Sequence, residues 1–85
     1  MSSDPELPQV VLYTRKGCHL CDEVKDSLNR VSRQARFQLQ EIDIDTDPEL
    51  VRQFNDEIPV VFVRGRKAFK YHLKEEEFLR RLAEG

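Results

Sequence analysis

Two cysteines stand where a short apolar segment gives way to an amphipathic one, and this junction limits the folds open to the chain. Residues 9–13 form an apolar, β-branched run that is typical of a buried strand. After a short polar loop, apolar residues recur at steps of four, four and three, at Leu20, Val24, Leu28 and Val31. That spacing predicts one face of a helix over residues 18–34, which places Cys18 and Cys21 at its start.

The middle of the chain predicts a second strand and a short helix. Residues 37–44 alternate as a strand would, but the alternation slips between Leu39 and Ile42, which indicates either a bulge or two covered faces. A short helix then follows, with Thr46 or Asp47 as its cap, a proline in its first turn and a carboxylate beside its positive end; it ends near Asn55.

The last part of the chain predicts a hairpin followed by a helix. Residues 60–63 are a second buried strand, residues 64–67 form the turn, and residues 68–71 return. Residues 74–83 open with acids and close with arginines, as the helix dipole prefers. The order β-α-β-α-β-β-α predicts an α/β fold: a four-stranded mixed sheet flanked by helices, parallel in its first half and antiparallel at the hairpin.

Size and charge restrict the class of protein. With 85 residues, the chain has room for one small domain. We expect a flexible N-terminal tail over residues 1–8 and a single domain over residues 9–85. The net charge of −2 argues against a nucleic-acid partner, which usually requires a basic domain. No apolar stretch approaches the roughly 18 residues of a membrane span, and no export signal is evident. We therefore expect a cytoplasmic monomer without a membrane partner.

The sequence Cys-His-Leu-Cys carries the strongest chemical signal. Two residues three apart lie on one face of a helix, so the sulfurs of Cys18 and Cys21 can approach to bonding distance. The N-terminal end of a helix favours a thiolate, and Arg15 and Lys16 add positive charge there. Cys21 lies one turn deeper in the helix and should be less exposed than Cys18. This asymmetry suits an attacking Cys18 and a resolving Cys21 in thiol–disulfide exchange.

The cysteine pair has two other interpretations, a zinc site and a pair of inert thiols. A zinc site normally needs two more ligands at ordered spacing, whereas the chain offers only His19 inside the motif and the distant His72. No metal site is therefore expected. A pair of inert, packed thiols remains the second alternative to redox chemistry.

Two stretches together resemble the small glutaredoxin-like proteins of the thioredoxin-like superfamily. Residues 11–21 resemble the glutaredoxin opening, and residues 58–63 resemble the segment that carries the family's cis-proline. The resemblance covers residues 10–82. It implies a thioredoxin-like, glutaredoxin-type fold and a thiol–disulfide oxidoreductase whose redox-active disulfide joins Cys18 and Cys21.

The same resemblance implies a substrate-binding set. By analogy with the family, Pro59 is cis and faces the cysteine pair, and the backbone of Ile58 forms hydrogen bonds to a bound thiol peptide. Arg15 stands where the family usually has a lysine, and it is the third expected substrate-binding residue.

The sequence departs from the family at three places. His19 and Leu20 replace the proline and tyrosine between the cysteines; a protonated His19 would stabilise the thiolate, and the alternative is a solvated side chain. Bulky residues at 69–73 replace the glycine pair and aspartate that grip glutathione. Gly17 stands where thioredoxins have a tryptophan. We expect no tightly bound cofactor, with glutathione retained as a candidate reductant.

Three functions follow as hypotheses. The first is an oxidoreductase that acts on a protein disulfide or a small thiol and is recharged by an unidentified reductase. The second is a carrier in which Cys18 thiolates from two chains hold a [2Fe–2S] cluster. The third is a non-catalytic interaction module that binds a partner through the surface around Pro59.

Charge is unevenly distributed along the chain. Residues 58–74 hold five basic side chains and no acid, whereas residues 41–57 hold seven acids and one basic residue. One interpretation is a basic hairpin that docks an acidic partner, or the carboxylates of glutathione, beside the active site. The other is a polarised but solvated surface.

Overall fold

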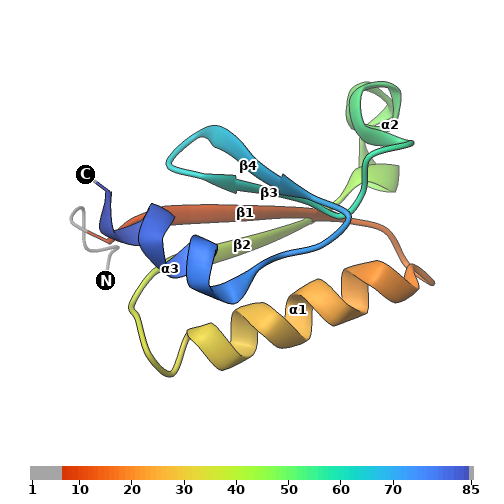
Figure 1. Ribbon diagram of the computed structural model, residues 1–85. Coiled ribbons are helices and arrows are strands. Elements are labelled where there is room, and N and C mark those ends of the chain that lie inside the picture. The colour runs from red at the N-terminus through yellow and green to blue at the C-terminus, as the bar shows by residue number, and fades with distance from the viewer. Residues whose placement is uncertain (1–6, 85) are drawn as a thin grey trace.

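The fold is a mixed sheet with two helices on one face and one on the other (Figure 1). The computed structural model describes residues 7–84. The strands are β1 (Gln9–Thr14), β2 (Gln38–Asp43), β3 (Val60–Val63) and β4 (Arg66–Lys70). The helices are α1 (His19–Val31), α2 (Pro48–Phe54) and α3 (Glu75–Ala83), with a short 3-10 helix, η1 (Ile44–Thr46), before α2.

The sheet order is β2-β1-β3-β4. Strand β1 pairs parallel with β2 and antiparallel with β3, and β3 pairs antiparallel with β4. The predicted element order, the mixed sheet and the antiparallel hairpin are therefore confirmed.

Alternation along β1 divides the core into two layers. Val10 and Leu12 are fully buried against α1 and α3, whereas Tyr13 packs on the opposite face beneath α2. Strand β3 alternates in the same way, since Val61 faces the first layer and Val60 the second. Burying each such side chain contributes about 1.5–3 kcal/mol, so both faces of these two central strands stabilise the fold.

The layer under α2 is largely aromatic. The rings of Tyr13 and Phe54 stack with centroids 4.6 Å apart, and Phe62 packs edge-on against both. This small cluster anchors α2 close to the end of β1, where the cysteine-bearing loop begins (Figure 1).

The predicted second strand needs correction. Strand β2 ends at Asp43 and pairs with β1 in an unbroken register, so the slip in alternation reflects neither a bulge nor two covered faces. Ile44 is buried but belongs to η1, and Leu39 lies 41% exposed on this edge strand. The sheet's irregularity lies elsewhere, between β3 and β4 after Val61.

Several predicted boundaries also shift. Helix α1 starts after Cys18 and ends at Val31, three residues before the predicted end at residue 34. The hairpin turn contains only Arg64 and Gly65, so β4 begins two residues before the predicted start at residue 68 and stops before Tyr71. Both turn residues have positive φ, at 53° and 82°, the geometry of tight two-residue turns.

The structure describes only the last two residues of the tail predicted over residues 1–8. Residues 1–6 of the expected tail lie outside the described residues. Pro8 is buried, and its carbonyl accepts a hydrogen bond from the Gln38 amide at 2.9 Å, so contacts with the sheet already include residue 8. Within residues 7–84, no helix is long and apolar enough to cross a membrane.

The cap of α2 provides a test of the local structure. The Asp47 carboxylate accepts a hydrogen bond from the Glu49 amide at 2.9 Å, which settles the choice between Thr46 and Asp47. We expect Asp47→Ala to lower the free energy of unfolding by about 1 kcal/mol, because that amide loses its partner. Urea denaturation monitored by circular dichroism measures the change. Asp47→Asn retains an acceptor and serves as the control; equal losses in both variants would contradict the capping role.

Candidate active site

Cys18 ends the loop that joins β1 to α1, and Cys21 lies in the first turn of α1; the two form a disulfide with Cα atoms 5.2 Å apart. Cys18 is the N-cap residue of α1, with extended backbone angles of φ −92° and ψ 113°. Its Sγ accepts a hydrogen bond from the Cys21 amide at 3.1 Å. Gly17, at φ 76°, turns the chain into the helix through a conformation that other residues rarely adopt.

The two sulfur-bearing residues differ in accessibility. Cys18 is partly exposed, whereas Cys21 is fully buried one turn into the helix. An N-cap position places Cys18 next to unpaired backbone N–H groups and the positive end of the helix dipole, both of which favour a thiolate. The predicted difference in exposure is therefore confirmed, and the pair is suited to sequential attack and resolution.

Arg15, expected to bind substrate, makes several contacts within the protein. Its Nε and Nη2 donate to the Asp45 carboxylate at 3.0–3.1 Å, and Nη2 also donates to the Asn55 side chain at 2.9 Å. The guanidinium thus connects the loop before Cys18 to η1 and to the end of α2. Its charge is balanced by Asp45, so Lys16 is the exposed cation left in this loop.

His19 is solvated rather than packed against the cysteines. Its side chain is 88% exposed, and Nε2 lies 3.3 Å from the carboxylate of Glu23, one turn along α1. His19 is therefore a solvated side chain on the first turn of α1, one of its two predicted roles.

Pro59 follows a cis peptide bond with Ile58 and is buried immediately before β3. Because Tyr13 pairs with Val60, the proline lies at the same end of the sheet as the loop that follows β1 (Figure 1). Ile58 precedes β3, so its N–H and C=O are not part of the sheet ladder.

An ion pair borders the proline loop. The Lys67 ammonium donates to Glu57 at 2.7 Å, and this hydrogen bond lowers the pKa of Glu57 below its ordinary value. The charge next to the loop is thereby neutralised within the protein.

Tyr71 is the residue that sequence reasoning missed. The strand predicted over residues 68–71 includes it, but it lies beyond β4 with φ 70° and is 39% exposed. Its amide donates to the Pro59 carbonyl at 2.8 Å, and its hydroxyl donates to the Asp56 carbonyl at 2.6 Å. The only hint was its place in the stretch that replaces the family's glycine pair, where a positive φ suits glycine.

A hollow of about 290 Å³ lies beside the loop that precedes Cys18. The Thr14 hydroxyl at its wall is buried without a hydrogen-bond partner among the described residues. On another wall, Lys25 pairs with Glu41 at 2.8 Å, and that hydrogen bond raises the pKa of Lys25. Between residues 7 and 84, no group of three or more His, Cys, Asp or Glu side chains is arranged to hold a metal ion.

The predicted basic hairpin does not lie beside the cysteines as a unit. Arg64 lies in its turn and Arg66 begins β4, so both lie at the opposite end of the sheet from the loop after β1 (Figure 1). Lys67 is paired with Glu57. Because β3 runs away from the cysteines, the basic residues between 58 and 74 do not form one patch beside them.

Comparison with known proteins identifies relatives along most of the chain. A family model described as a glutaredoxin-like domain (DUF836) matches residues 9–83. An uncharacterized protein of Mycobacterium tuberculosis is 36% identical over 73 residues, which cover 80% of this chain and 75% of that protein. A glutaredoxin-like protein of Dictyostelium discoideum is 28% identical over 71 residues, which cover 76% of this chain and 66% of that protein.

Solved structures show the same architecture. The solution structure of a Nitrosomonas europaea protein matches with a TM-score of 0.81 and 33% identity, over 98% of this chain and all of that one. Oxidised mitochondrial thioredoxin 3 from Saccharomyces cerevisiae matches with a TM-score of 0.66 over 88% of this chain and 76% of that one. At 12% identity, that second match is a likeness of fold alone. The chain belongs to the glutaredoxin-like family and has the thioredoxin fold.

Proposed function

We propose that the protein is a thiol–disulfide oxidoreductase that uses both cysteines. The observation that carries the proposal is the contrast between Cys18, a partly exposed N-cap whose sulfur accepts a backbone hydrogen bond, and Cys21, which is fully buried. A substrate sulfur has access to the first but not to the second. Attack therefore starts at Cys18 and ends with Cys21.

The chemistry balances in two steps. In the reduced protein, the Cys18 thiolate attacks a substrate disulfide, which forms a mixed disulfide and releases one substrate thiolate. Cys21 then loses its proton and attacks the Cys18 sulfur, which releases the second substrate thiolate and closes the internal disulfide. Two electrons pass to the substrate, and two external thiol groups must return them, becoming a disulfide themselves. Two glutathione molecules or one dithiol reductase protein would supply those thiols.

The proline loop supports a peptide substrate. The N–H and C=O of Ile58 precede the sheet ladder, at the end of the sheet where the β1–α1 loop begins. This geometry fits an extended segment of a substrate that pairs with the backbone of the loop. Arg15 contributes by fixing the cysteine loop through Asp45.

Tyr71 favours protein disulfides over glutathione as substrates. It belongs to the stretch of residues 69–73 that, by the family resemblance, replaces the glycine pair that grips glutathione, and two hydrogen bonds join it to the loop of residues 56–59. An exposed aromatic ring is a suitable surface for apolar side chains of a protein partner. We therefore propose a monomeric, cytoplasmic enzyme that acts on a protein disulfide.

Single cysteine variants test the division of labour. We expect Cys18→Ser to lower the rate at which a model protein disulfide is reduced to the rate without enzyme, because the attacking thiolate is lost. We expect Cys21→Ser to accumulate a mixed disulfide at Cys18, because the second step is blocked. Intact mass measured after acid quench detects the adduct.

The double variant Cys18→Ser/Cys21→Ser is the control. Wild-type rates in Cys18→Ser, or no adduct in Cys21→Ser, would contradict the mechanism. Undiminished binding of a partner by the double variant would favour the non-catalytic module instead.

Variants at Tyr71 test the choice of substrate. Tyr71→Gly suits the positive φ and removes the ring, whereas Tyr71→Phe keeps the ring and removes only the hydroxyl. We expect Tyr71→Gly to raise the efficiency with a glutathionylated peptide roughly tenfold over Tyr71→Phe, equivalent to about 1.4 kcal/mol. Steady-state kinetics give the ratio of the catalytic efficiency with the glutathionylated peptide to that with a protein disulfide. Equal ratios in the two variants would show that the ring does not determine the choice of substrate.

A further inference from the structure

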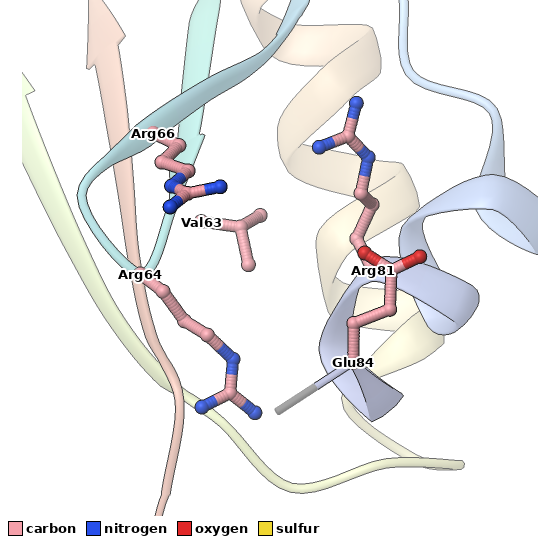
Figure 2. Close-up of a pocket in the computed structure, with 5 residues that line it drawn as sticks. All are labelled: Val63, Arg64, Arg66, Arg81 and Glu84. Atoms are coloured by element: carbon pink, nitrogen blue, oxygen red, sulfur yellow. The ribbon is translucent and has the colours of Figure 1, made fainter.

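A hollow of about 290 Å³ opens between the β3–β4 turn and the last turn of α3. Figure 2 shows Arg64 and Arg66 on the hairpin wall, Arg81 and Glu84 on the helix wall, and Val63 between them. This hollow lies at the end of the sheet opposite the cysteine loop, because β3 runs away from Pro59 toward the turn (Figure 1).

The hollow concentrates positive charge on a protein whose net charge is negative. Three guanidinium groups and one carboxylate line it, which gives a local excess of two positive charges, whereas the whole chain carries −2. Arginine stays protonated at physiological pH, so this excess persists in the cell.

Arg64 holds the two walls together. Its backbone has φ 53°, a left-handed conformation that is unusual for a residue with a side chain, and Gly65 follows at 82°. Its guanidinium donates to the Leu82 carbonyl in α3 at 2.8 Å. The turn is therefore tied to the end of the helix, and the width of the hollow is set by a hydrogen bond.

The other two arginines are open to a ligand. Arg66 and Arg81 are exposed, and neither forms an ion pair with any of residues 7–84. They stand on opposite walls of the hollow (Figure 2).

We propose that this hollow binds a phosphate dianion, free or as the end group of a small monoester, with Arg66 and Arg81 as its ligands. Two negative charges match the local excess of two positive charges. The planar guanidinium donates paired hydrogen bonds to oxyanions, and a tetrahedral phosphate offers oxygens to both walls. A volume of about 290 Å³ lies at the small end of ligand pockets and suits a small anion. The Glu84 carboxylate can accept a hydrogen bond from a hydroxyl of the ester.

Titration followed by NMR tests the proposal on the full, oxidised chain labelled with ¹⁵N. Inorganic phosphate and glycerol phosphate are added separately at constant ionic strength, with acetate as the monoanion reference. We expect saturable shifts of amides in the β3–β4 turn and at the end of α3. Tighter binding of glycerol phosphate would identify an ester as the ligand, and equal binding would identify free phosphate; both agree with a phosphate site.

Charge-matched variants distinguish a specific phosphate site from nonspecific electrostatic attraction. We expect Arg66→Gln and Arg81→Gln each to weaken phosphate binding about tenfold. Arg52→Gln removes the same charge from exposed α2 and should leave the affinity unchanged. Shifts that do not saturate, acetate binding as tight as phosphate, or an equal loss in Arg52→Gln would overturn the proposal. Disulfide reduction by the same variants reports independently on the cysteines.

Discussion

The antiparallel pairing of β1 with β3 is the contact on which both ends of the molecule depend. Residues of the two strands alternate between two apolar layers, so a slip of one residue would move every side chain into the wrong layer. Once this register is fixed, the loop after β1 places Cys18 at the end of the sheet where Pro59 enters β3. The same register sends the turn after β3 to the far end, where it meets α3.

The parts of the fold that the sequence predicted are those that depend on local signals. The apolar period of α1 and the spacing of its two cysteines are properties of adjacent turns of one helix, so the position of Cys18 at the helix start followed directly. The N-cap of α2 is also a local feature, so the sequence limited it to Thr46 or Asp47. The family resemblance supplied the cis bond before Pro59, which local propensity alone did not support.

The missed features depend on contacts between distant residues. Arg15 meets Asp45 across 30 positions, and no local pattern showed that its charge would be balanced there. Tyr71 follows a strand and has a strand-forming side chain, so alternation extended the strand to include it. Its positive φ and its bonds to residues 56 and 59 become visible only when the chain has folded back on itself.

Ion pairs explain why the charge pattern of the sequence was misleading near the cysteines. Three of them, Arg15–Asp45, Lys25–Glu41 and Lys67–Glu57, join the acidic segment to neighbouring elements and neutralise charge around the redox end. Exposed pairs of this kind contribute only about 0–1 kcal/mol each to stability, so their main effect is on where free charge remains. Under the proposed function, recognition of a disulfide partner then depends on backbone pairing at Ile58 and on the ring of Tyr71, with Lys16 and Lys70 as the exposed cations left at this end. The arginines at the opposite end have no such neutralising partners within residues 7–84, and the attraction for anions is concentrated there.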